Sequence, residues 1–262
     1  MILKFIENVG DKTISSILAI YELLKLSFLC FIHLPNPYSY NPVMRKTVIK
    51  QIYFTAITIL PSFMMMAFVF GTVIIGMVIV VATKFNLQLQ TGSIIVTFAI
   101  NEFAPLFTAF FIAFRSGAVL NTKVAVMNVN NELKRYEEQN IDIIDNLFLP
   151  HIISGILSTV FLAALFALIM ISSGYVFSLF YLNMDLHAYT YLILNAMEVR
   201  DIMILLLKST AFGFVTMLIP IYSGLKAVQT NISVSISVLN GMVKLFIAIL
   251  FIEVLSLVIQ LI

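Results

Sequence analysis

Four ionisable residues interrupt the apolar runs of this sequence: Glu102, Arg115, Lys208 and Glu253. A charge within a bilayer is costly unless it is paired or hydrated, so each position needs an explanation. One explanation is structural pairing inside a helix bundle, such as Glu102 with Arg115 or Lys208 with Glu253. The other is a polar lining for a substrate cavity between helices, and the two are compatible. Arg115 is also placed where its side chain could reach a membrane interface.

No motif of enzyme chemistry accompanies these charges. The sequence has no GxxxxGK[ST] phosphate-binding loop, no GxSxG elbow and no HExxH pair. The histidines His33, His151 and His187 are scattered, and the single cysteine, Cys30, cannot form an internal disulfide. We therefore expect no catalytic residue, no metal site and no cofactor bound by this chain. The net charge of +2 gives no reason to expect a nucleic-acid partner.

The composition places these charges in a membrane. Of 262 residues, 61% are hydrophobic and 11% are charged, whereas soluble domains carry about a quarter charged residues. A spanning helix needs about 20 apolar residues, and the sequence contains five such runs. It therefore predicts an all-α integral membrane protein with five transmembrane helices in a single domain, 1–262. The runs lie at roughly 51–82, 93–120, 149–182, 201–223 and 240–262.

The first 46 residues have a different pattern. Residues 14–33 form an otherwise apolar helical stretch with Glu22 and Lys25 near its middle. Two charges inside a span are costly, so a helix lying in the membrane interface is favoured over a sixth span. We therefore expect 1–46 to be an amphipathic interfacial segment that precedes the five spans, with a spanning helix at 14–33 as the alternative.

Lysine and arginine gather in alternate hydrophilic regions of the chain. They are frequent before the first span, at 121–147 and at 224–244, and sparse at 84–92 and 183–200. Because basic residues favour the cytoplasmic side, this alternation predicts a cytoplasmic N-terminus and an external C-terminus.

The hydrophilic region at 121–147 mixes charges of both signs with helical spacing. Val124, Met127, Asn131 and Lys134 would share one face of a helix. A short charged helix between two spans is placed to meet a cytoplasmic partner, and a solvated connector is the plainer interpretation.

The stretch EFAPLFTAFFIAFRSG, residues 102–117, resembles the ELGP…AGRxG signature of the MlaE/YrbE permease family. Glu102, Pro105, Arg115 and Gly117 fall on the family's pattern. Members of this family are the membrane subunits of ABC transporters that work with MCE proteins on phospholipids and other lipids.

The resemblance extends along nearly the whole chain. Lys208 and Ser209 match a Lys-Ser pair that opens the fourth span, and Glu253 falls where the family often has an acidic residue. Some positions depart from the pattern, which suggests a divergent branch. These are Ala104 and Phe114 in place of glycines, Lys123 in place of an acidic residue, Ala125 in place of glycine and Asn131 in place of a frequent glutamate.

The resemblance implies a homodimeric permease in a bacterial inner membrane. It would move phospholipid or a related lipid between that membrane and a periplasmic MCE-domain protein. Separate ATP-binding subunits, carrying ATP and Mg, would dock below through the coupling segment 121–147. The residues implied for this docking are Lys123, Met127, Asn131, Glu132, Lys134 and Arg135.

The same resemblance implies a lipid cavity at the dimer axis, lined or coupled by Glu102, Lys208 and Glu253. The departures at Lys123, Ala125 and Asn131 motivate an alternative. In that alternative the chain is a non-transporting scaffold or assembly subunit that retains the permease fold.

Overall fold

The computed structural model describes residues 2–34, 42–87, 90–227 and 231–261, and the regular elements within these ranges are all helical. Five stretches are long and apolar enough to cross a membrane, which confirms the predicted all-α membrane fold. These stretches are Met44–Lys84, Thr91–Val129, Ile144–Leu182, Val199–Leu225 and Val234–Gln260.

The first three spans are built from shorter elements because tighter or wider helical turns interrupt them, whereas the fourth and fifth lie within α10 and α11. The turn η2 is a 3-10 helix, and η4, η5 and η6 are π-helical. In chain order the elements are α1 (Ile2–His33), α2 (Pro42–Thr55), η2 (Ile57–Ile59), α3 (Leu60–Lys84), α4 (Thr91–Val96), η4 (Thr97–Phe103), α5 (Ala104–Ile112), η5 (Ala113–Gly117), α6 (Ala118–Val129), α7 (Glu132–Glu138), η6 (Ile144–Phe148), α8 (Leu149–Leu182), α9 (Leu186–Ala196), α10 (Val199–Leu225) and α11 (Asn231–Leu261).

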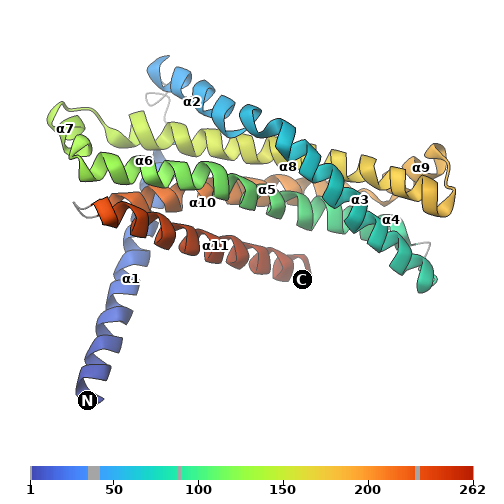
Figure 1. The fold of residues 1–262 in the computed structure, drawn as a ribbon, viewed down its shortest axis with the longest axis horizontal. Helices are drawn as coiled ribbons and strands as arrows, with labels where there is room; N and C mark the ends of the chain where they lie inside the picture. Colours follow the sequence, from blue (N-terminus) through green and yellow to red (C-terminus); the bar gives the residue numbers. More distant parts are fainter. Residues whose placement is uncertain (1, 35–41, 88–89, 228–230, 262) are drawn as a thin grey trace.

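The long helices lie side by side, as Figure 1 shows, with α7 at one end of the bundle and α9 at the other. We call these the α7 end and the α9 end. The α7 end gathers the regions that the basic-residue pattern predicts to be cytoplasmic, and the α9 end gathers the regions predicted to be external. The two ends are therefore separated as the alternation of charge requires.

The helical stretch that contains the first apolar run begins at Met44, before that run. α2 opens with Pro42, whose fixed φ suits the first turn of a helix, and the span that follows takes in basic residues that were assigned to the preceding segment. The interfacial segment predicted at 1–46 therefore ends inside α2, and its residues 35–41 lie outside those the structure describes.

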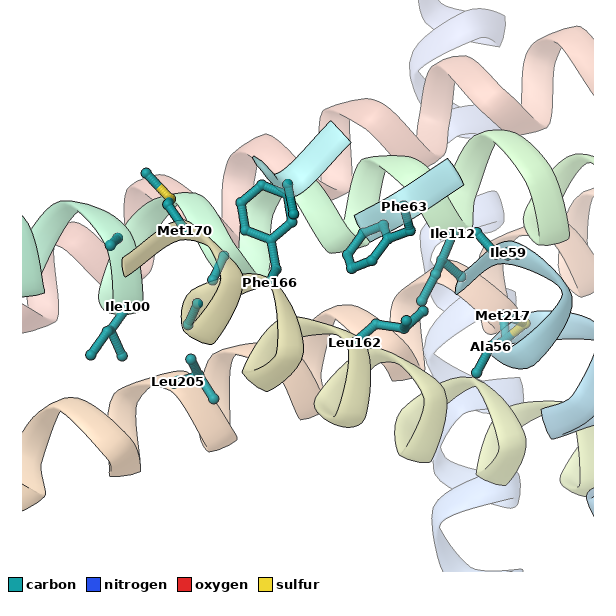
Figure 2. Packing of buried hydrophobic residues seen from close by; sticks show 14 of the residues in the cluster. Ala56, Ile59, Phe63, Ile100, Ile112, Leu162, Phe166, Met170, Leu205 and Met217 are labelled. Atoms are coloured by element: carbon teal, nitrogen blue, oxygen red, sulfur yellow. The ribbon is translucent and has the colours of Figure 1, made fainter. Parts of the chain in front are cut away.

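α8 and α10 form the centre of the bundle, where large apolar side chains interlock. Phe63 of α3 packs its ring 5.4 Å from that of Phe166 and 5.3 Å from that of Phe111. Figure 2 shows Phe63, Phe166, Leu162 and Ile112 meeting between α3, α5 and α8. Within a bilayer such packing, rather than the hydrophobic effect, holds helices together.

Glycines allow α8 and α10 to approach closely. A Cβ atom on Gly213 would lie 2.6 Å from the Cα of Ile156, and one on Gly155 would collide with Cγ of Met217. A backbone atom cannot move aside as a side chain can, so Gly213 sets the spacing of the two helices. This spacing in turn positions the polar residues of α10.

α1 runs at a steep angle to the long helices, as Figure 1 shows. Its described apolar side chains are mostly exposed, Phe28 and Phe31 among them. It contacts the bundle at the α7 end, where Glu22 pairs with Lys226 at 2.6 Å and the His33 ring lies 2.7 Å from a carboxylate oxygen of Asp145. A helix crossing the bundle in this way has the geometry that an interfacial helix needs, and its placement in the interface stays a prediction.

The predicted coupling segment differs from the single helix its spacing suggested. α6 continues the second span as far as Val129, and Asn131, with φ of 56°, then turns the chain into the short helix α7. Asparagine tolerates this left-handed conformation better than most residues. Lys123 and Met127 are therefore on a span helix, and only residues from about 130 onward stand apart from it.

Candidate functional site

Three of the four charged residues predicted at membrane depth meet in one cluster. The Nζ atom of Lys208 lies 2.5 Å from Oε2 of Glu102 and 2.9 Å from Oε2 of Glu253. These residues come from three different elements, α10, η4 and α11. The cluster lies about 14 Å from the start of α10, nine residues at 1.5 Å each, which is mid-depth in a hydrocarbon core of about 30 Å. We call it the ion cluster.

Pro105 explains why a backbone atom joins the ion cluster. In an α-helix the amide of residue 105 would donate to the carbonyl of residue 101, but proline has no N–H. The preceding turn, η4, is π-helical, and the Asn101 carbonyl accepts a hydrogen bond from Lys208 Nζ at 2.9 Å. A proline that looked like part of a sequence signature thus provides an acceptor for a buried ammonium group.

A second set of polar side chains holds the ion cluster in place. Gln260 donates to Oε1 of Glu102 at 3.1 Å and to the Ser256 hydroxyl at 3.1 Å. Asn101 donates its side-chain amide to Asp201 at 2.8 Å, and Asp201 accepts from the Glu198 amide at 2.9 Å. The start of α10 is thereby joined to the turn that carries Glu102.

The charges of the ion cluster compensate one another within an enclosed space. The Lys208 side chain is 2% exposed, that of Glu253 is 11% and that of Glu102 is 16%. Removing one member of a buried ion pair is strongly destabilising because the other charge remains without a partner. The arrangement can therefore hold three helices in a fixed relation, and it would resist their separation.

Arg115 lies outside the ion cluster, so the pairing of Glu102 with Arg115 that the sequence allowed does not form. Arg115 is in η5, where it is exposed and lines a groove at the α7 end with Lys46, Lys50 and Lys123. The alternative pairing, Lys208 with Glu253, is present. The two π-helical turns of the second span thus each contain one charged residue of the signature. Glu102 in η4 lies in the ion cluster, and Arg115 in η5 lies in the groove at the α7 end. Such turns are frequent at functional sites.

The residues predicted for coupling divide by burial. Met127 is buried and packs within the bundle, as does Leu133 of α7. Lys123, Lys134 and Arg135 are exposed, and Asn131 and Glu132 are half-buried at the turn between α6 and α7. Met127 is therefore a packing residue, whereas Lys134 and Arg135 are available to a partner.

α6 is tied to the end of α10 by side-chain hydrogen bonds. Asn128 donates to the carbonyls of Leu225 and Ala227 at 2.8 and 2.9 Å. Ser223 donates to the Ser237 carbonyl at 2.8 Å, which joins α10 to α11. These hydrogen bonds fix the end of α6 against the helix that carries Lys208.

Several site residues were missed from the sequence. Asn101, Asp201, Ser256 and Gln260 support the ion cluster, and α9, inside the loop predicted at 183–200, was not expected. The signal available was that each polar residue lies one to seven positions from a predicted charge, on the same helix. A search for polar neighbours of intramembrane charges would have found them.

An apolar cavity of about 410 Å³ lies beside the ion cluster, between α8, α9 and α10. Ile100 and Leu205 line it, one and three residues from Asn101 and Lys208 respectively. The cavity is large enough for part of an acyl chain. Among the described residues no group of three or more histidines, cysteines or acids is gathered as a metal site would require.

Comparisons with known proteins match the chain over most of its length. The family described as "Permease MlaE" matches residues 48–259. Probable ABC transporter permease proteins of Rickettsia typhi and Rickettsia prowazekii are 24% and 25% identical; the alignments cover 85% and 86% of this chain and 80% and 85% of those proteins. The intermembrane phospholipid transport system permease protein MlaE of Haemophilus influenzae is 22% identical over 90% of this chain and 89% of that protein.

Proposed function

The chain belongs to the MlaE permease family, and on that premise we propose that it moves phospholipid or a related lipid as the membrane subunit of an ABC transporter. The exchange would take place between a bacterial inner membrane and a periplasmic MCE-domain protein. The observation that carries the proposal is the family match over 48–259, which spans nearly all of the five membrane helices. The name of the Haemophilus relative supports phospholipid as the substrate.

The ion cluster is assigned a coupling role in this proposal. Lys208 is too enclosed to meet a lipid headgroup, so Lys208 and Glu253 hold α10 and α11 against η4 while the bundle changes shape. Glu102, the most accessible member, is the one that could line a cavity. Helices joined by compensated charges move together, because separating the charges in hydrocarbon is costly.

The apolar cavity between α8, α9 and α10 suits an acyl chain. Its wall is almost wholly apolar, so it offers dispersion contacts and no hydrogen-bonding groups to specify a headgroup. Its position at the α9 end, predicted to be periplasmic, would bring a bound chain close to an MCE-domain partner.

A second copy of this chain is proposed to cover α11. Leu239, Val243, Ile247, Leu250 and Val254 lie three or four residues apart and are all exposed. This spacing puts them on one helix face. A homodimer through α11 would place the ion clusters of the two copies near a shared axis.

ATP and Mg are expected on a separate ATP-binding subunit, which supplies the energy of transport. α7 is the proposed docking element, because Lys134 and Arg135 are exposed at the α7 end and α6 links that end to α10. The charge-reversal pair Lys134→Glu with Arg135→Glu should abolish capture of the ATP-binding subunit by the purified permease. The matched control is Lys84→Glu, which reverses an exposed charge at the α9 end.

Transport itself is tested by reconstitution with the ATP-binding and MCE-domain partners. We expect ATP-dependent transfer of labelled phospholipid between liposomes and the MCE protein, and we expect Lys208→Ala or Glu253→Ala to reduce it. A complex that assembles but whose ATP hydrolysis and lipid transfer are indifferent to both substitutions would instead favour the scaffold alternative. The departures at Lys123, Ala125 and Asn131 motivate that alternative.

A further inference from the structure

A groove of about 670 Å³ opens at the α7 end between the first and second spans. Four cations line it: Lys46 and Lys50 on α2, Arg115 on η5 and Lys123 on α6. No acidic residue is among the described residues that line it. We call this the basic groove, and it is separate from the ion cluster and from the apolar cavity.

The cations of the basic groove have no carboxylate to balance them within the described part of the chain. All four side chains are exposed, and none forms an ion pair with a described acid. Like charges brought together repel one another, and this repulsion favours the binding of an anion. The basic groove therefore has no described negative charge of its own, and an anionic ligand could supply one.

The depth of the basic groove matches a lipid better than a soluble anion. Lys46 and Lys50 lie near the beginning of the first span, and Phe54, an exposed apolar residue that also lines the groove, lies further along the same helix. Phe54 is about 12 Å from Lys46 along the helix, eight residues at 1.5 Å each. A phospholipid has this same order of groups, with a charged headgroup outside and acyl chains inside.

A buried hydroxyl group in the lining of the basic groove also points to a ligand. Thr55 lines the groove, is 1% exposed, and its Oγ1 atom has no hydrogen-bond partner among the described residues. Other helical threonines, such as Thr108 and Thr122, donate to the carbonyl four residues earlier at 2.7 and 3.0 Å. A buried hydroxyl without a partner is costly, and a phosphate or ester oxygen would satisfy it.

We propose that the basic groove binds the headgroup of an anionic phospholipid in the leaflet at the α7 end. The cations neutralise the phosphate, Thr55 donates to an oxygen of the lipid, and Phe54 contacts the acyl chains. An acidic segment of a partner protein is less well matched, because α7, the element that stands apart from the spans, contributes nothing to the lining. The proposal does not depend on transport.

The test is lipid retention by the purified full-length protein, measured by native mass spectrometry. Phosphatidylglycerol should be retained in preference to zwitterionic phosphatidylcholine, and inorganic phosphate should compete only weakly because it lacks the acyl chains. Lys46→Gln with Lys50→Gln should weaken phosphatidylglycerol binding about thirtyfold, since each basic residue near a membrane contributes about one factor of five. Thr55→Val should weaken it by a smaller factor.

The matched control is Lys134→Gln with Arg135→Gln, which removes the same charge from α7, at the same end of the molecule but outside the basic groove. This control should retain phosphatidylglycerol as the unmodified protein does. Equal losses in the two double variants, or unchanged binding in Lys46→Gln with Lys50→Gln, would overturn the proposal. The proposal would also be overturned if Lys46→Gln with Lys50→Gln lost capture of the ATP-binding subunit while its lipid retention did not change. That result would mean that a protein occupies the basic groove. Lipid transfer is measured in a separate assay, so the lipid-retention result can be interpreted even if the protein does not transport lipid.

Discussion

The ion cluster and the basic groove are two charged regions in the same helical bundle, and they are organised in opposite ways. In the ion cluster one ammonium group faces two carboxylates and a backbone carbonyl, and all are enclosed. In the basic groove four cations face one another, all are exposed, and no described acid lines the site. A buried charge must be compensated by another group of the chain, whereas an exposed charge can be compensated by a bound ligand.

This contrast indicates that the charges of the ion cluster stabilise the fold, whereas those of the basic groove are available to bind a ligand. Lys208 and Lys50 are both on helical stretches long and apolar enough to cross a membrane. What distinguishes them is whether a carboxylate shares the space around the ammonium group. Substitutions should therefore affect stability strongly in the first region and ligand binding in the second.

The largest effect is expected from Lys208→Met. It leaves Glu102 and Glu253 buried against each other without a cation, which should lower the free energy of unfolding by about 3–5 kcal/mol. Thermal or denaturant unfolding in detergent measures this. Adding Glu102→Gln and Glu253→Gln to the same variant should restore more than half of the loss, and no restoration would mean that the charges are not the cause.

A smaller loss is expected from Gly213→Ala, which tests whether helix spacing positions the ion cluster. The added Cβ would lie 2.6 Å from the Cα of Ile156, so α8 and α10 must separate. Overpacking of this kind costs about 1–3 kcal/mol. The control is Thr210→Ala, which puts the same residue at an exposed position of the same helix and should unfold like the unmodified protein.

Lys50→Gln should not lower the free energy of unfolding as Lys208→Met does. Removing one cation from the basic groove relieves repulsion and breaks no ion pair with a described acid, so the free energy of unfolding should stay within about 0.5 kcal/mol or rise. The same unfolding assay measures it. A loss comparable with that of Lys208→Met would contradict the comparison between the two regions.

The smallest effect is expected from Glu22→Gln, which removes the surface pair that Glu22 of α1 forms with Lys226 of the bundle. The hydrogen bond from Lys226 lowers the pKa of Glu22, with a further contribution from Tyr222. A lowered carboxyl pKa adds stability above the ordinary carboxyl pKa of about 4.3, and that stability is lost as the pH falls through the lowered value. Protease cleavage of α1 should therefore increase only at strongly acidic pH, and Glu22→Gln should remove that dependence.

Much of the fold could be predicted from the sequence because a bilayer restricts the choices. Continuous apolar runs of about 20 residues identified all five spans, since backbone groups in hydrocarbon must pair within the helix. Boundaries were less predictable, as at α2 and α6, because a helix continues past the apolar run when flanking residues still favour it. α9 was missed for a similar reason, being too short to stand out from its loop.

The candidate site was predictable in its members and not in its geometry. Intramembrane position alone selected Glu102, Lys208 and Glu253, and the structure brings these three together. Arg115 was selected by the same argument and lies elsewhere, because it comes 13 residues after Glu102 on the same span, which corresponds to about 20 Å along the helix. The roles of these residues in lipid movement and coupling stay predictions until they are tested.

The π-helical turns η4 and η5 also affect how the second span tolerates a change in length. Each wide turn accommodates one residue more than an ordinary turn, and one residue corresponds to a rotation of about 100° around the helix. Loss of a single amino acid there could convert a wide turn into an ordinary one while the rest of the helix keeps its orientation. Insertions and deletions of one residue between distant relatives should therefore collect at these two turns, whereas in α8 or α10 the same change would rotate every following side chain.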